Sequence, residues 1–547
     1  MHYSLRQSNC VETSSRKIQS RVIARLFYLS LLILTFDFCR AQIVYVPLDQ
    51  SVYGFLQRTY ARGFHSLNGE VIPYSTVQVA SALVAIEKND SLLSKGEREE
   101  LEFHKTAFKS ELLTLDSTIH TGVRWNLVNY ESPNMAVVLD PVAGIIVGNG
   151  FRHTYTGAAF SGELGGIVGF NFRFHDNSES GDNIDAQKKD TPETGINIIS
   201  RPDPKTIQYS DITATIGVNW TWGVFSVGKD YINWGMGNRG KLILSSKAPS
   251  FPFLRLDLHP TDWLRFYYLH GWLQSDVLDS LRTYSSRIAA YPRNIYREKY
   301  IAAHLLSLSV THNLNISIGE SIIYSDIQPN IMFLNPLLFY RAVDHYMTST
   351  SIGDGNNSQF FGNIDYRGLH NMDLYGTLFI DEINTDEIFN DAKARNQLGF
   401  TVGARSELLA QYGVSLNAEY TRILPWVYSN FVQTQVYESS GYLLGDYIGQ
   451  NADQIYGEII YRPTYNSSVQ VYYDYVRKGG LADVAYEYQL PSLPFLYGTV
   501  ERRTVYGFSG QYEVYYDLKV RVFAEYNSQR AVKVLGGVAV SYGLSKN

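Results

Sequence analysis

The spacing that most resembles a chemical motif in this chain is a glycine-rich run. The segment Gly235–Lys241 matches G-x-G-x-x-G and most of a phosphate-binding P-loop. Both nucleotide-binding motifs require a helix whose N-terminal amides receive the phosphate. The residues that follow, Leu242–Ser246, have the pattern of a strand, and Leu242 stands where a magnesium-binding Ser or Thr is needed. We therefore interpret the run as a turn between strands.

Other catalytic patterns have little support. The sequence contains no H-E-x-x-H and no G-x-S-x-G motif. Asp381 and Glu382 are adjacent at a strand end, so their side chains point to opposite faces, whereas a glycosidase needs both carboxylates facing one sugar ring. Separate loops could still bring two acids together. Because these catalytic motifs are missing, we expect no enzymatic activity and no cofactor. We also expect no metal site, because the following histidines lack the spacing of metal ligands: His65, His104, His153, His175, His259, His270, His304, His312 and His345.

A carbohydrate-binding surface has better support from residue types. Sugars stack their C–H groups on aromatic faces, and polar side chains bond their hydroxyls. The same residue types could instead form a salt-bridged network that braces the interior, since buried charges usually pair. The candidate carbohydrate-binding residues are Lys229, Asp230, Tyr231, Trp234, Arg239, Glu320, Tyr324, Asn335 and Asp365.

The elements that would position these residues are mostly strands. From Ala214 to Val224, apolar residues at even positions alternate with polar residues or glycine. This period of two indicates a strand between two environments, and Trp220 and Trp222 on its apolar face are typical of a lipid boundary. Similar alternation, with charged residues on the second face, recurs in segments 414–421, 469–475, 518–525 and 532–544. A soluble sandwich would not bury so many charges, so residues 119–547 are predicted to form a membrane-spanning antiparallel β-barrel.

Composition and length agree with a barrel. The chain has 42 Tyr, 27 Phe and 43 Gly in 547 residues, which suits aromatic girdles and tightly curved strands. The length after residue 118 accommodates about 16–19 strands. Three stretches, 175–205, 348–358 and 478–490, are too polar for lipid and are predicted to be long extracellular loops.

Residues 42–118 have a different pattern. Ser51–Arg62 has apolar residues at helical spacing, and Ser75 with Gln78 has the spacing of a capping box, as does Ser94 with Glu97. We predict three short helices that dock on the larger domain, because they are too few to bury a large core alone. The acids between Glu97 and Glu100 are interpreted as a solvated first turn, favoured by the helix dipole.

Residues 1–41 have the pattern of an export signal peptide. Arg and Lys residues precede an apolar core, residues 26–36, and Ala41 fits a signal-peptidase site. Lipidation at Cys39 is the alternative, but Phe38 is bulky for that processing. Removing these residues takes away both cysteines and changes the formal net charge from -6 to -10, since they carry six Lys/Arg and two acids. An acidic mature chain argues against a nucleic-acid partner.

Several blocks of sequence resemble the Wzi-type capsule assembly proteins. The departure that we note is Met236, where the family usually has proline after Trp-Gly. The blocks are Val46–Asp49, Lys229–Gly237, Leu244–Pro249, Lys299–His304, Glu320–Tyr324 and Asn335-Pro336. The resemblance implies an outer-membrane barrel of eighteen strands, whose periplasmic side is closed by the N-terminal helices, and it spans most of the chain.

The resemblance also implies a function. We expect a non-catalytic, lectin-like barrel in the outer membrane that binds and organises or anchors capsular or other surface polysaccharide. Its other expected partners are outer-membrane lipid and the barrel-assembly machinery. The alternative is a diffusion channel for small solutes or sugars, which would need an open path through the barrel.

Overall fold

The computed structural model describes residues 45–116, 121–122, 124–132, 135–165, 167–197, 199–288, 291–350 (side chains to 347), 355–382, 396–487 and 492–543. The predicted signal peptide, residues 1–41, lies outside the described residues. Within them, no helix has the length and apolar character needed to cross a membrane.

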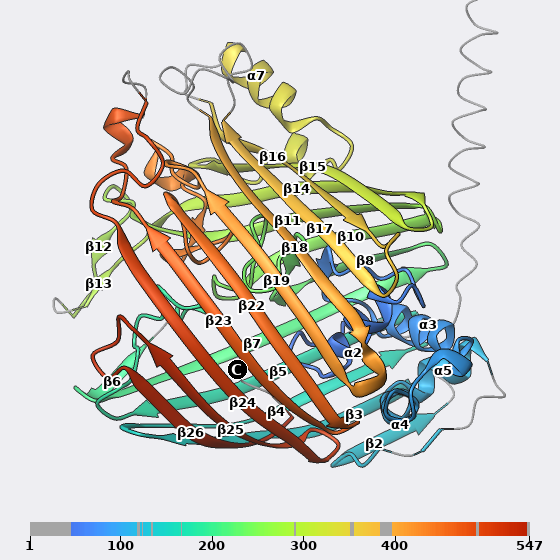
Figure 1. Ribbon diagram of the computed structural model, residues 1–547. Coiled ribbons are helices and arrows are strands. Elements are labelled where there is room, and N and C mark those ends of the chain that lie inside the picture. Colours follow the sequence, from blue (N-terminus) through green and yellow to red (C-terminus); the bar gives the residue numbers. More distant parts are fainter. Residues whose placement is uncertain are drawn as a thin grey trace, which may run out of the picture.

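Eighteen antiparallel strands close into a barrel over the described part of the chain (Figure 1). Each pairs with the next barrel strand along the chain, and β26 pairs with β3 to close the ring. The predicted fold class is confirmed. The barrel strands are β3 (Met135–Gly148), β4 (Phe151–Leu164), β5 (Val168–Ser180), β7 (Thr206–Trp220), β8 (Gly223–Asp230), β10 (Phe251–Thr261), β11 (Leu264–Leu278), β14 (Tyr296–Thr311), β15 (Leu314–Ser325), β16 (Asn357–Tyr366), β17 (Met372–Glu382), β18 (Gln397–Leu409), β19 (Val414–Ile423), β22 (Ala452–Thr464), β23 (Ser467–Lys478), β24 (Glu501–Tyr515), β25 (Leu518–Asn527) and β26 (Val534–Tyr542).

Shorter elements complete the sheet and its connections. β2 (Val128–Ser132) pairs with the part of β3 that β26 leaves open, and β6 (Ser200–Asp203) pairs with β7. The small antiparallel pairs are β1 (Val71–Ile72) with β9 (Asn233–Trp234), β12 (Tyr284–Ser285) with β13 (Pro292–Arg293), and β20 (Glu438–Ser439) with β21 (Tyr442–Leu443). Short 3-10 turns are η1 (Asp90–Leu92), η3 (Ala410–Tyr412), η4 (Gln433–Gln435) and η5 (Val484–Tyr486).

The two faces of the barrel wall differ in polarity. Outward-facing Ile216, Val402 and Val471 are exposed, whereas inward-facing Thr401 and Asp474 are buried. An apolar outer face around a polar interior is the architecture of a barrel that spans a membrane. The period-two pattern of the sequence therefore identified the two faces of these strands.

The alternation was extended too far at one hairpin. β7 ends at Trp220, and Thr221 and Trp222 form the turn to β8. Val224, predicted on the apolar outer face, is consequently buried, while Phe225 and Val227 of β8 are exposed. Even-numbered residues face outward before the turn and odd-numbered residues face outward after it. Continuing the alternation through the turn therefore assigns the residues of β8 to the wrong faces.

The two ends of the barrel have connections of different length. At one end, two-residue turns such as 262–263, 312–313 and 465–466 join the strands. At the other end most connections are long, including 231–250 and 424–451. The predicted loop 175–205 begins later than expected, because the polar residues from 175 to 180 continue β5 and alternate between lumen and exterior.

The N-terminal helices lie at the short-turn end (Figure 1). Phe103 stacks on Tyr516 at a centroid distance of 4.7 Å and lies 5.7 Å from Tyr465, and both tyrosines belong to turns. Arg367 donates to the carbonyl of His65 at 2.9 Å. The helices are α2 (Val52–Ala61), α3 (Thr76–Glu87), α4 (Lys95–Ala107) and α5 (Lys109–Leu115).

Both predicted capping boxes are present, at Ser75 and Ser94. The interpretation of Glu97 and Glu100 as solvated was wrong. Both are buried: Glu100 forms an ion pair with Arg58 of α2, and Glu97 forms one with Arg62, the C-cap residue of α2. Helix α4 therefore uses its acids to dock on α2.

Two long connections fold back into the barrel and form what we call the lumen plug, residues 231–250 and 424–451. Their apolar side chains pack against inward-facing wall residues such as Leu269 and Phe379. Tyr428 donates to the carbonyl of Leu242 at 2.7 Å, which joins the two connections. Gln57 of α2 donates to Asn238 of the plug at 3.4 Å, so the plug and the helical domain meet inside the barrel.

The expected strand Leu242–Ser246 is absent. These residues form an irregular part of the plug, with Leu244 making an isolated bridge to Trp234. The apolar run is satisfied by burial in the plug instead of by pairing in the wall. Because no helix follows Lys241, whose ammonium group donates to the carbonyl of Gly235 at 2.8 Å, this loop has no phosphate-binding geometry.

Candidate functional site

A cavity of about 1300 Å³ occupies the part of the lumen that the plug leaves free. Its walls are the inner faces of β4, β5 and β7 on one side and of β23–β25 on the other. The N-terminal segment Tyr45–Tyr60 lines it at the helical end, and residues 183–197 line it from the long connection after β5. The cavity therefore brings together three parts of the chain that are far apart in sequence: the N-terminal segment, the region from β4 to β7 with its connection, and strands β23–β25.

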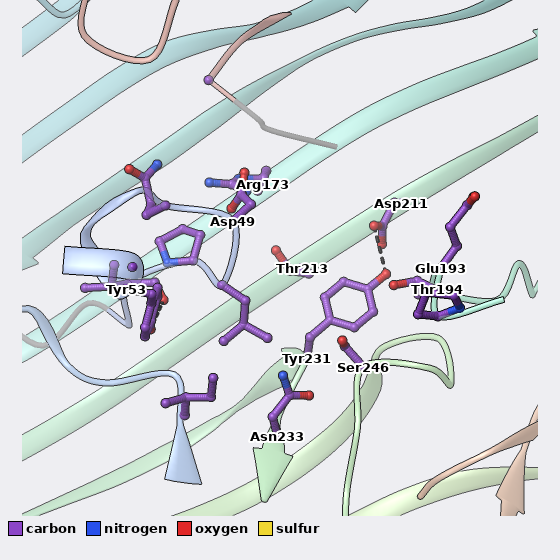
Figure 2. Close-up of a pocket in the computed structure, with 18 of the residues that line it drawn as sticks. Asp49, Tyr53, Arg173, Glu193, Thr194, Asp211, Thr213, Tyr231, Asn233 and Ser246 are labelled. Atoms are coloured by element: carbon purple, nitrogen blue, oxygen red, sulfur yellow. Dashed lines mark hydrogen bonds and ion pairs between the residues drawn. The ribbon is translucent and has the colours of Figure 1, made fainter. Parts of the chain in front are cut away.

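Tyr231 projects into the cavity from the start of the plug (Figure 2). Its hydroxyl donates to Asp211 of β7 at 2.8 Å. The Nε2 atom of His175 on β5 lies 3.8 Å from the same carboxylate. An aromatic ring beside an oriented carboxylate offers both kinds of contact that a sugar ring uses.

An ion pair between the helical domain and the barrel wall also lines the cavity. Asp49 accepts from Arg173 of β5 at 3.0 Å, and Figure 2 shows this pair close to Tyr53. The pair ties the N-terminal segment to the barrel wall. Because the Arg173 guanidinium is planar with several donors, it can also bond hydroxyl or carboxylate groups of a ligand.

A third group lies where residues 183–197 close over the cavity. Lys188 forms ion pairs with Glu193 at 2.6 Å and with Glu179 of β5 at 3.2 Å. Lys247 from the plug donates to the carbonyls of Thr191 and Glu193, each at 2.9 Å. Burial lowers the pKa of Lys247 to about 8. These bonds fix the connection against the plug.

Arg239 of the plug packs against the opposite wall of the cavity. Its guanidinium carbon lies 4.9 Å from the ring centroid of Tyr472 and 5.2 Å from that of Tyr456. Its Nε donates to Asp474 at 3.1 Å. The stack of an arginine on two tyrosines, beside an acid, gives this wall of the cavity a flat, hydrogen-bonding surface.

Four of the nine candidate residues line this cavity: Lys229, Asp230, Tyr231 and Arg239. Lys229 donates to the carbonyl of Ile212 at 2.8 Å and to Ser250 at 2.6 Å. Asp230 accepts from the backbone amide of Tyr231 at 2.8 Å. Their role in binding carbohydrate stays a prediction.

The other five candidates lie elsewhere. Trp234 is buried in the core of the plug and offers no face to a ligand. Asp365 accepts from Tyr60 and from Asn315, so it anchors the helical domain. Glu320, Tyr324 and Asn335 belong to a separate region on the outside of the wall, described below. Bracing, the alternative reading, describes Trp234 and Asp365 best.

Sequence reasoning missed several cavity residues. Arg173, Asp211 and Glu193 contribute charge to the site, yet none was a candidate. Arg173 lies between the outward-facing Phe172 and Phe174 of β5, so the period-two pattern could have identified it as an inward-facing residue. The plug and the connection after β5 meet through tertiary contacts, and no local pattern predicts these.

No group of three or more His, Cys, Asp or Glu suited to a metal ion occurs among the described residues. Asp49, Asp211, Glu193 and Asp474 of the cavity are held by arginine, tyrosine or lysine donors. The site as built offers hydrogen bonds and aromatic surface.

The comparisons with known proteins agree with this arrangement. The profile of the family described as capsule assembly protein Wzi matches residues 195–537. This chain belongs to that family. The match includes the plug, the outer-wall region and most of the barrel, which confirms the resemblance of the sequence blocks to Wzi-type proteins. No curated protein sequence matches the chain.

Among solved structures, Wzi of Escherichia coli superimposes with a TM-score of 0.57 at 13% identity, covering 92% of this chain and 100% of that one. That protein is described as an outer membrane protein involved in group 1 capsule assembly and as a carbohydrate-binding β-barrel. OccK5 of Pseudomonas aeruginosa gives a TM-score of 0.41 at 12% identity, over 75% of this chain and 97% of its own. At 13% identity, the superposition on Wzi of Escherichia coli shows that the two chains share a fold.

Proposed function

We propose that this family member is an outer-membrane barrel that binds surface polysaccharide and organises or anchors it at the cell surface. Membership of the capsule assembly family and the barrel fold shared with a carbohydrate-binding relative support the proposal. The observation that carries it is the lumen cavity of about 1300 Å³, which several sugar units would fill. Tyrosine rings, hydroxyls and fixed charges line this cavity.

We place the helical domain on the periplasmic side and the long connections outside the cell. The support is the asymmetry of the barrel, because membrane barrels keep short turns at the periplasmic end and long loops at the outer end. The helices dock on the short-turn end through Phe103 and Arg367. The connection that covers the cavity, residues 183–197, would then face the polysaccharide.

The mechanism is lectin-like and includes no catalytic step. The glycan would stack on Tyr231 and on the Arg239–Tyr472 surface, while Arg173 and Asp211 bond its hydroxyls. Binding energy from several such contacts would hold the polymer without changing it. Outer-membrane lipid and the barrel-assembly machinery are the other partners that a barrel of this kind requires.

A diffusion channel is the alternative function. A channel needs a continuous water path, but the plug packs on the inner wall, and α2 of the helical domain contacts the plug and an inward-facing acid of the wall through Gln57 and Tyr60. We therefore favour binding over transport. Conductance measurements distinguish the two, since an open barrel of eighteen strands should conduct ions steadily.

The decisive experiment is to delete the gene and compare cell-attached with shed polysaccharide. We expect the polymer to be made but to move from the cells to the medium. Complementation with the native gene should restore attachment, and complementation with an Arg173→Ala/Tyr231→Ala double variant should not, at equal barrel levels in the membrane. If the amount of polysaccharide attached to the cells does not change after the deletion, the proposal is wrong.

A further inference from the structure

A group of polar side chains faces outward from one part of the barrel wall, where lipid would be expected. On β15, Ile316 and Ile318 are exposed on the outer face, and the period of two places Glu320 and Tyr324 on the same face. His304 of β14 pairs directly with Glu320 across the strands, with 3.2 Å between Nε2 and the carboxylate. A carboxylate in contact with lipid is costly, so this patch needs protection.

The protection comes from a segment that we call the outer cover, residues Asn330–Met347. It contains α6 (Ile331–Leu334) and the beginning of α7 (Tyr340–Thr350), which follow β15 and lie at the end of the barrel opposite α3–α5 (Figure 1). Glu320 accepts from the backbone amides of Tyr340 at 2.6 Å and Arg341 at 3.4 Å. The buried carboxylate is thus bonded at the N-terminus of α7, where the helix dipole favours a negative charge.

The inner face of the outer cover packs on aromatic side chains of the wall. Phe333 lies 4.7 Å from Tyr324, and Tyr340 lies 4.7 Å from His304, as ring-centroid distances. Tyr268 of β11 donates to the carbonyl of Phe333 at 3.2 Å. Phe333 and Tyr340 are fully buried, so the cover is fixed to three neighbouring strands.

The opposite face of the outer cover is apolar and exposed. The exposed fractions are 80% for Ile331, 83% for Leu337, 54% for Phe339 and 64% for Tyr346. Four large apolar residues within one short segment form a patch that a water-soluble surface would rarely present. Arg341 is also exposed on this segment, and its guanidinium donates to Ser358 at 3.1 Å.

We infer that the outer cover is a lipid-binding element whose exposed apolar side chains lie in the outer surface of the bilayer. The patch continues the lipid-facing wall, since the cover sits on the same face of β15 as Ile316 and Ile318. Tyr346 and Arg341 are residue types that membrane interfaces favour, and Phe339 suits the apolar face of an interfacial helix. The cover therefore seals the Glu320–His304 patch from lipid and makes a lipid contact of its own. The inference requires that the barrel spans a bilayer and does not depend on glycan binding.

The test uses single cysteines in the full chain, with Cys10 and Cys39 replaced by serine. Leu337→Cys carries an environment-sensitive fluorophore, and the barrel is reconstituted in vesicles containing lipids with a doxyl group on the acyl chain. Ile318→Cys on the lipid-facing wall is the membrane control. Leu281→Cys, 96% exposed in the connection after β11, is the aqueous control.

We expect the fluorophore at residue 337 to be quenched by doxyl lipid at least twofold more than the one at residue 281, and to resemble the one at residue 318. Aqueous iodide should show the reverse order. If the fluorophore at residue 337 is quenched by iodide as strongly as at residue 281, the cover faces water, and the patch is a surface for another macromolecule. Because Leu337 is exposed, its replacement should not disturb folding, and a glycan-binding assay on the same variant would show whether the cavity is intact.

Discussion

Polar and charged side chains of the cavity are bonded to one another before any ligand arrives. Tyr231 and Asp211 form one such pair, and Arg173 and Asp49 form another. Pairs of this kind hold donors and acceptors in fixed directions. Because the binding surface is ordered in advance, less conformational entropy of the protein is lost when a sugar binds. Tyr231 is the residue that combines an aromatic face with this network.

Replacing Tyr231 with alanine should therefore weaken glycan binding about tenfold, which corresponds to about 1.4 kcal/mol. Tyr231→Phe should fall between the native protein and Tyr231→Ala, because it keeps the ring and loses the hydroxyl. Titration of the purified barrel with polysaccharide from the same cells measures the effect. Tyr473→Ala on the outward face of β23 is the matched control. Equal affinity of native and Tyr231→Ala proteins would place the glycan outside this part of the cavity.

Glu111 of α5 gives the helical domain a dependence on pH. Burial raises the pKa of Glu111 to about 7, above its ordinary value near 4.5. In the folded domain the carboxyl therefore holds its proton at pH values where the unfolded chain has lost it. The stability of the domain should fall as pH rises from about 4.5 to 7 and then stay low, by roughly 3 kcal/mol in total.

Glu111→Gln should remove this dependence. At pH 8 the variant should be more stable than the native domain, and at pH 4 the two should be alike. Native-state hydrogen exchange of α3 and α5 measures the difference without unfolding the barrel. Glu99→Gln, on the exposed face of α4, is the control and should change little at either pH. Equal exchange of the native protein and Glu111→Gln at pH 8 would mean that the carboxyl is solvated.

At the scale of elements, the helices differ in how their N-termini are satisfied. Ser75 accepts from the amide of Gln78, and Ser94 accepts from the amide of Glu97, each completing a capping box. Ser51 stands at the same position before α2 but makes no side-chain cap hydrogen bond. The chain thus contains two capped helices and a comparison helix in one domain.

Ser75→Ala and Ser94→Ala should each reduce local stability by about 1 kcal/mol, because one partly buried amide of the first turn loses its acceptor. Ser51→Ala should cost clearly less. Exchange rates of the amides in the first turns of α2, α3 and α4 report the three effects separately. Similar costs at all three positions would show that helix propensity, and not the cap, sets the stability of these ends.

At the scale of the whole molecule, the helical domain and the plug enter the barrel from opposite ends. Arg367 holds the domain through the carbonyl of His65, and its guanidinium carbon lies 4.0 Å from the ring centroid of Tyr60. The plug is held by Tyr428 and by inward-facing wall residues. Two independent obstructions in one lumen predict a barrel that barely conducts ions.

The native protein in a planar bilayer should show almost no steady current. Arg367→Ala should produce transient openings, because it removes the arginine that joins the helical domain to the turn after β16. Arg477→Ala, which removes the ion pair with Asp453 near the other end, is the control and should stay closed. A large, steady current through the native protein would favour the channel function.

The strands and the capping boxes could be predicted because they depend on local periodicity. Alternation between Ser415, Asn417 and Glu419 on one face and Leu416 and Ala418 on the other requires only that one face meets the lumen and the other lipid. Ser75 and Ser94 satisfy amides three residues away. These interactions are contained within short segments, so the sequence by itself determined the barrel class and the helical N-terminal region.

The tertiary structure decided which candidates share a site. Trp234 and Tyr231 are three residues apart, yet one is buried in the plug and the other lines the cavity. Glu320 is an acid like those that line the lumen, but its position on β15 places its side chain on the outer face of the wall, under the outer cover. Such placements depend on where long connections fold back and on which strand faces them. They arise from contacts between residues distant in the chain, and local residue patterns carry no record of those contacts.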